Sequence, residues 1–180
     1  MKFRLALAAA TLAMVAAPSL ARNPMVGGAA MYPTKNIVEN AVNSRDHTTL
    51  VAAVKAAGLV DTLSSAGPFT VFAPTNAAFV RLPAGTVETL VKPENKGTLT
   101  SILTYHVVAG RVTSTGLARM IRAGRGRANL TTVNGTRLTA RMHGRGIMLT
   151  DAKGGTAMVT IANVMQSNGV IHVIDHVLMP

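Results

Sequence analysis

The hydrophobic pattern of this 180-residue chain changes near Tyr105, and that change decides which class of fold the chain can adopt. Before Tyr105 the apolar residues recur mostly at helical spacing, most clearly at residues 50–57 ahead of Gly58. After Tyr105 β-forming residues predominate, and the strongest pair of strands is expected at residues 157–165 and 170–178. A helical first half followed by a strand-rich second half predicts an α+β domain.

Turn and cap signals place the remaining elements. Phe69–Ala73 is rich in β-formers and lies between Gly67-Pro68 and Pro74, so one strand is expected within the helical half. Two Asn-Gly pairs, at 134–135 and 168–169, predict tight hairpins, because Asn-Gly tolerates the positive φ of a primed turn. Further helices are expected at residues 37–42, 59–63, 87–91, 95–103 and 113–123, with a brief one capped by Thr75-Asn76.

The first residues have the layout of a secretory signal peptide. Lys2 and Arg4 precede an apolar run at residues 5–17, and a small-residue exit ends at Ala21. The run is shorter than the roughly 20 residues that a helix needs to cross a bilayer. We therefore expect cleavage after Ala21 and a periplasmic or secreted protein that does not span the membrane after cleavage.

The absence of cysteine bounds how the exported chain can be stabilised. It excludes disulfides, thiolate metal sites and a lipid anchor on an N-terminal cysteine. The roughly 160 residues that follow the signal are enough for one domain with a core of its own but not for two. We expect residues 22–35, which have Gly and Pro without periodicity, to form a flexible arm, and residues 36–180 to form the domain.

Three segments, taken in order, resemble the fasciclin domain family. They are residues 67–79 (GPFTVFAPTNAAF), 102–107 (ILTYHV) and 167–175 (SNGVIHVID). The resemblance implies a wedge or sandwich of about seven β-strands packed with several short helices. It also implies a non-catalytic extracytoplasmic adhesion or interaction module with no cofactor, and a cell-surface or matrix component as its partner. The motif positions to which it assigns structural roles are Pro74, Thr75, Asn76, Tyr105, His106, Asn168, Gly169, His172 and Asp175.

The resemblance does not extend to one adhesion motif. In animal matrix members of the family, an Asp-Ile pair just before the last block is implicated in integrin binding. The corresponding pair here is Asn163-Val164. A neutral amide is a poorer ligand for a hard cation than a carboxylate is, so the motif predicts no integrin contact of that kind.

The charge distribution is the main functional signal. The formal net charge is +11, and no acidic residue occurs between Glu94 and Asp151. The arginines of the basic region, which form the candidate anionic-partner surface, are Arg111, Arg119, Arg122, Arg125, Arg127, Arg137, Arg141 and Arg145. A field of one sign attracts anions, and Arg recognises them through bidentate hydrogen bonds. We expect either an anionic partner, such as an acidic polysaccharide, or a surface that only keeps the protein soluble. Nucleic acid is not expected, because export separates the protein from it.

The residues that could carry catalysis do not gather in the sequence. His172 and His176 would lie about 13 Å apart in a strand, too far for one metal ion. We expect His106 to be buried and bonded to backbone, His47 and His143 to face water, and Asp175 to accept local hydrogen bonds. No serine has a Gly-x-Ser-x-Gly setting. The sequence therefore predicts no catalytic, cofactor or metal residues, and no enzyme.

A second hypothesis is a carrier for an apolar small molecule such as a carotenoid, a role known for some fasciclin-type proteins. Its motivation is a set of methionines that could line an adaptable cavity. They are Met120, Met142, Met148, Met158 and Met165.

Overall fold

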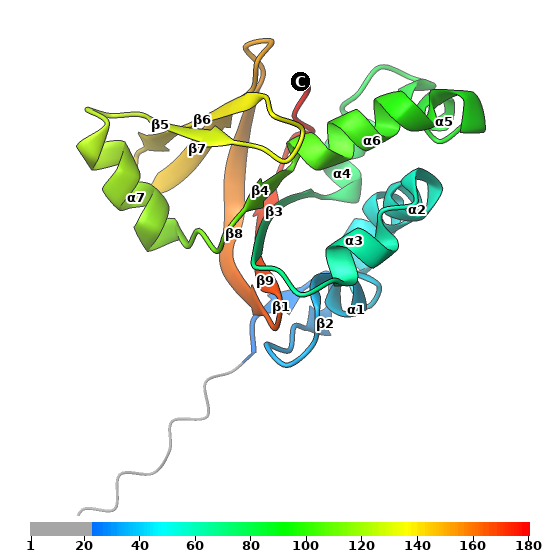
Figure 1. The fold of residues 1–180 in the computed structure, drawn as a ribbon, viewed down its shortest axis with the longest axis horizontal. Coiled ribbons are helices and arrows are strands. Elements are labelled where there is room, and N and C mark those ends of the chain that lie inside the picture. Colours follow the sequence, from blue (N-terminus) through cyan, green and yellow to red (C-terminus); the bar gives the residue numbers. More distant parts are fainter. Residues whose placement is uncertain (1–22) are drawn as a thin grey trace, which may run out of the picture.

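The computed structural model describes residues 23–180, so the predicted signal peptide at 1–21 lies outside the described residues. Seven strands form one mixed sheet in the order β4-β3-β9-β8-β7-β6-β5 (Figure 1). The strands are β3 (Phe69–Pro74), β4 (Val107–Ala109), β5 (Ala128–Thr131), β6 (Arg137–His143), β7 (Gly146–Thr150), β8 (Thr156–Gln166) and β9 (Gly169–Ile174). Val133 N–H donates to Val107 O at 2.7 Å, so the two edges of the sheet meet and the sheet nearly closes into a barrel. The predicted α+β class and the number of strands are confirmed.

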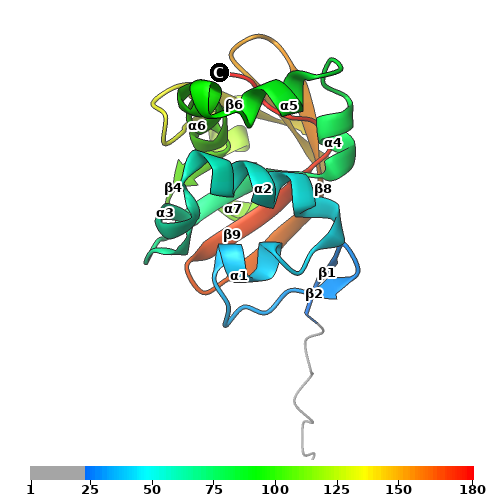
Figure 2. The same cartoon turned by 90° about the vertical axis from the view of Figure 1, so that its right-hand side faces the viewer.

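Among residues 23–180, seven α-helices pack around the sheet. They are α1 (Ile37–Ala41), α2 (Thr48–Ala57), α3 (Val60–Ser64), α4 (Asn76–Val80), α5 (Thr86–Leu90), α6 (Lys96–Tyr105) and α7 (Ser114–Ala123), with 3₁₀ turns at Arg45–His47 and Pro93–Asn95. Helices α1, α2 and α3 lie in front of β9 in Figure 2. Helix α7 lies on the other side of the molecule, beside β5 and β6 (Figure 1). The helices expected from apolar periodicity are present, with ends that differ by a few residues.

Strand β3 pairs in parallel with β9, from Phe69 opposite Gly169 to Pro74 opposite Ile174. This pairing places the two strand motifs of the sequence side by side although about 100 residues separate them. A Cβ on Gly169 would overlap the carbonyl of Phe69 and lie 3.0 Å from its carbon atom, so the close approach of β3 requires this glycine. The predicted hairpin is present, but neither Asn168 nor Gly169 has a positive φ. The positive φ expected of an Asn-Gly pair occurs only at Gly135, where φ is 87°.

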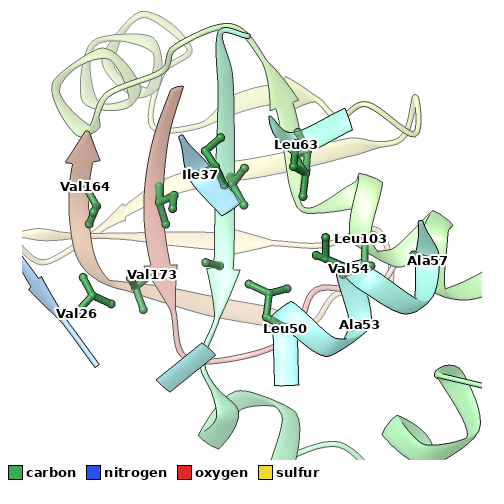
Figure 3. Packing of buried hydrophobic residues seen from close by; sticks show 14 of the residues in the cluster. Val26, Ile37, Leu50, Ala53, Val54, Ala57, Leu63, Leu103, Val164 and Val173 are labelled. Carbon is green, nitrogen blue, oxygen red and sulfur yellow. The ribbon is translucent and has the colours of Figure 1, made fainter. Parts of the chain in front are cut away.

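Alternation along β3 divides the interior into two hydrophobic clusters. Val71 and Ala73 face the cluster between the sheet and the helices, while Phe72 faces the cluster inside the barrel. In Figure 3 the side chains of Leu50 and Val54 extend from α2 toward the strands. Because both faces of β3 are buried, this strand is the centre of the core.

The N-terminal segment differs from the expected flexible arm. Residues Met25–Val26 (β1) and Ala29–Ala30 (β2) form a small hairpin, and Val26 and Met31 are only 5% and 2% exposed. The hairpin packs against the 3₁₀ turn, where Arg45 N–H donates to Gly27 O at 3.2 Å. Strands of two residues are too short to give a periodic pattern, so this part of the packed structure could not be recognised from the sequence.

Candidate functional site

The motif residues are occupied by internal hydrogen bonds. Asn168 is 8% exposed, and its Oδ1 accepts from Ile37 N–H at 3.0 Å. Its Nδ2 donates at 2.8 Å to the carbonyls of Leu63 and Ser65. This one side chain therefore hydrogen-bonds to a backbone N–H at the start of α1 and to backbone carbonyls at the end of α3. Such groups have no partner within their own helices.

His106 joins the end of α6 to the C-terminal segment. Nδ1–H donates to Ile102 O at 2.8 Å, and Nε2 accepts from Leu178 N–H at 3.0 Å, so the two contacts define a neutral tautomer. Burial lowers the pKa of His106 from 6.5 to about 4, although the Ile102 carbonyl and Asp151 favour the charged form.

His172 is also buried, and its contacts are with uncharged groups. Its Nε2 donates to Val112 O at 2.8 Å, and its ring stacks on Phe72 with centroids 5.6 Å apart. Burial lowers its pKa as well. His176 lies beyond the end of β9, and no group of three metal-ligating side chains gathers among residues 23–180.

Other motif positions fasten loops to the sheet and helices. The Tyr105 hydroxyl donates to Arg137 O at 2.8 Å and accepts from Ala152 N–H at 3.0 Å, and burial raises the pKa of Tyr105. Thr75 caps α4 at Ala78 N–H, directly after Pro74, the last residue of β3. Asn76 accepts from Thr49 N–H at 3.0 Å and thereby caps the start of α2. These contacts leave the motif side chains little capacity for a ligand.

Asp175 lies just past β9 and accepts from Met158 N–H at 2.7 Å and from His176 at 2.8 Å. Burial alone would raise the pKa of Asp175, but these hydrogen bonds and the charge of Arg81, 3.6 Å away, lower it. Arg81 and Asp175 form the only Arg–carboxylate ion pair among residues 23–180.

Seven of the eight candidate arginines lie on α7 and strands β5–β7, on the opposite side of the β3–β9 pair from α1–α3 (Figure 1). They are Arg119 and Arg122 on α7, Arg125 and Arg127 in the turn that follows, Arg137 and Arg141 on the outward face of β6, and Arg145 in the β6–β7 turn. All seven are exposed, and none has an acidic partner among residues 23–180. We call these seven the arginine face.

Arg111 is separate from the arginine face. It follows β4, and its Nη2 atom lies 3.4 Å from the carbonyls of Gln166 and Ser167. It borders an open surface groove together with Ser65, Pro68 and Asn168. The sequence placed Arg111 with the other arginines because only order along the chain was visible.

Asn163, at the position of the integrin pair, caps α7. Its φ is 58°, and it lies in the irregular part of β8. Oδ1 accepts from Ser114 N–H at 2.8 Å, and Nδ2 donates to Ser114 Oγ at 2.7 Å. The side chain therefore has a local structural partner.

An apolar cavity of about 50 Å³ lies between the helices and the sheet. Its walls include Val26 and Met31 near the N-terminal hairpin, Leu50 and Val54 of α2, and Ile171 of β9. None of the five methionines proposed for a carrier cavity lines it, and Met120 and Met142 are 38% and 43% exposed.

His47 lines this cavity and is 3% exposed, so the expectation that it faces water is wrong. Nδ1 lies 2.8 Å from Ser44 Oγ, while Nε2 is the one buried side-chain polar atom among residues 23–180 that has no hydrogen-bond partner. Burial lowers the pKa of His47, although Ala73 O and Asp46 favour its charged form. The N-terminal hairpin, which the sequence did not reveal, covers this turn.

The nearly closed seven-stranded sheet, with motif residues such as Asn168, His106 and Tyr105 hydrogen-bonded to the backbone, defines an α+β fold that presents an unpaired basic surface. The fasciclin domain family matches residues 45–180, and the chain belongs to this family. Domains of this family generally serve as extracellular adhesion or interaction modules.

Known proteins resemble most of the chain. "Protein sll1483" of Synechocystis is 46% identical over 175 residues, covering 97% of this chain and 90% of that protein. "Immunogenic protein MPB70" of Mycobacterium bovis is 36% identical over 191 residues, covering 95% and 90% of the two chains. A structure of a FAS1 domain pair from the insect cell adhesion molecule Fasciclin I superposes with a TM-score of 0.73 at 18% identity. That match covers 81% of this chain and 51% of the insect chain, about half its length.

None of the helices formed by residues 23–180 combines the length and the apolar character needed to cross a membrane.

Proposed function

We propose that this protein is a periplasmic or secreted interaction module that binds an acidic polysaccharide through the arginine face. The observation that supports this most directly is the set of seven exposed guanidinium groups without acidic partners on one side of the described structure. Charge complementarity attracts a polyanion from a distance, and guanidinium forks then form paired hydrogen bonds with carboxylate or sulfate groups.

The arrangement of the arginine face suits an extended polymer better than a compact ligand. Arg137 and Arg141 lie on one strand face four residues apart, about 13 Å at 3.3 Å per residue. Arg119 and Arg122 are neighbours one turn apart on α7. Charges spaced in this way can contact successive acidic sugars along a polymer.

Retention on immobilised heparin in a sodium chloride gradient tests this function. The triple variant Arg125→Ala, Arg127→Ala and Arg141→Ala is expected to elute at clearly lower salt, because surface charge contacts are screened. A control with the same loss of charge on the helical side, Arg45→Ala with Lys92→Ala and Lys96→Ala, is expected to elute close to the unmodified protein. Equal shifts for both variants, or retention that does not respond to salt, would refute a localised polysaccharide surface.

The cavity does not support a carotenoid carrier. At about 50 Å³ it holds only a few atoms, and the methionines that motivated this hypothesis lie elsewhere.

A further inference from the structure

The cavity beside α2 contains one polar atom that the fold does not use. His47 Nε2 is buried without a hydrogen-bond partner in a wall otherwise made mainly of aliphatic side chains. Leaving a buried polar group unpaired is unfavourable, and the great majority of such groups in folded proteins have a partner. A small molecule in the cavity that hydrogen-bonds to Nε2 would relieve this cost.

The imidazole is held so that Nε2 stays available. Ser44 Oγ engages Nδ1 at 2.8 Å, and the N-terminal hairpin packs over this turn because Gly27, with φ 57°, has no side chain. A Cβ on Gly27 would lie 2.7 Å from Asp46 N and 2.8 Å from Arg45 N. The ring is thus fixed in place, and Ala73 O lies close enough to favour its charged form, although Nε2 makes no hydrogen bond of good geometry.

The rim of the cavity shows how a molecule could enter. Val38 of α1 and Val51 of α2 are half-buried, and Lys55 of α2 is exposed, whereas Leu50, Val71 and Ile171 at the interior are buried. The cavity therefore lies nearest to solvent between α1 and α2, where a small molecule would enter by displacing these rim side chains.

We propose that this cavity binds a small neutral molecule with a short aliphatic body and a terminal hydroxyl that hydrogen-bonds to His47 Nε2. The aliphatic walls favour the apolar body. A hydroxyl both donates and accepts, so it satisfies Nε2 in either tautomer of the imidazole. A carboxylate is disfavoured at Nε2, because the buried imidazole is neutral at pH 7 and the Lys55 ammonium belongs to the exposed rim of the cavity. The size of the cavity, about 50 Å³, restricts the ligand to a few heavy atoms.

Titration with 1-butanol and with 1-chlorobutane tests the proposal on the protein lacking residues 1–21. The two probes have similar bodies, but only the alcohol offers a hydroxyl. Amide shifts of Val51 and Ile171, together with the imidazole ¹⁵N shifts of His47, report occupancy by NMR. We expect saturable binding of both probes, with the alcohol about three- to tenfold tighter, the ratio that one hydrogen bond provides.

Two variants identify the polar anchor. The double change His47→Leu and Ser44→Ala removes the imidazole together with its partner and is expected to abolish the preference for the alcohol. His143→Leu, a change of the same kind at an exposed site, is expected to preserve the preference. Equal affinity of the unmodified protein for the two probes would overturn the role of His47. Absence of saturable shifts with either probe would overturn the site itself, because water or side chains would then fill the cavity.

Discussion

Acid is expected to destabilise this fold through His106. In the folded protein the pKa of His106 is about 4, whereas an exposed histidine has a value of 6.5. Between these two values the unfolded chain binds a proton that the folded protein does not bind, so stability falls as pH falls. His106 is only 2% exposed, and its two nitrogens are hydrogen-bonded to Ile102 O and to Leu178 N–H. Water does not reach the ring in the folded protein, so it cannot stabilise the protonated imidazole there.

The magnitude follows from the two pKa values. Lowering the pH from 7.5 to 4.5 removes about 2.5 kcal/mol of unfolding free energy through this one group. His47 and His172 have lowered pKa values too and add to the loss in the same direction. The contribution of His106 is therefore measured by comparing the pH-dependent loss of unfolding free energy in the unmodified protein with the loss in a variant that lacks His106.

The measurement is urea denaturation at pH 7.5 and 4.5, followed by far-ultraviolet circular dichroism because the chain has no tryptophan. His106→Gln retains a donor and an acceptor but cannot titrate, so its pH-dependent loss is expected to be smaller by about 2.5 kcal/mol. His143→Gln, at an exposed position, is expected to behave as the unmodified protein does. If His106→Gln loses as much stability between the two pH values as the unmodified protein, the buried neutral imidazole is not the cause.

Three substitutions test other contacts by the same denaturation assay. Asn168→Ala is expected to cost about 3 kcal/mol, because it leaves Ile37 N–H and Leu63 O buried without partners; a loss below about 1 kcal/mol would mean that water replaces the amide. Tyr105→Phe is expected to cost about 1–2 kcal/mol through the contacts to Arg137 O and Ala152 N–H. Gly27→Ala is expected to cost more than about 1 kcal/mol because of its positive φ and the contact with the 3₁₀ turn. An unchanged midpoint for Gly27→Ala would contradict the packing of the N-terminal hairpin.

Periodicity predicted elements whose two faces differ in exposure. Helix α7 was recognised because Leu117 and Ile121 are buried while Arg119 and Arg122 are exposed, and this contrast is visible in the sequence. Strands β8 and β9 were recognised from β-formers around an Asn-Gly pair. Both signals are local, so no knowledge of the rest of the fold was needed.

The features that escaped prediction depend on contacts between distant segments. His47 begins a helix in the sequence and resembles a solvent-facing residue, but the hairpin at Met25–Ala30 covers it. Gly169 was expected to provide a positive φ, yet its role arises from the approach of Phe69, 100 residues earlier. Arg111 was grouped with the arginine face by order along the chain, although it lies beside the β8–β9 turn.

The residues of the family motifs differ from the residues that are available to bind a partner. Asn168, His106 and Tyr105 direct their polar atoms to backbone groups, so these side chains specify the fold and have little left to offer a partner. The guanidinium groups of the arginine face and His47 Nε2 have the opposite property, since they have no acidic or hydrogen-bonding partner within residues 23–180. Recognition by such a domain is expected to depend on residues outside the shared motifs. Proteins with the same motifs can then bind different partners without any change in the core that holds the sheet together.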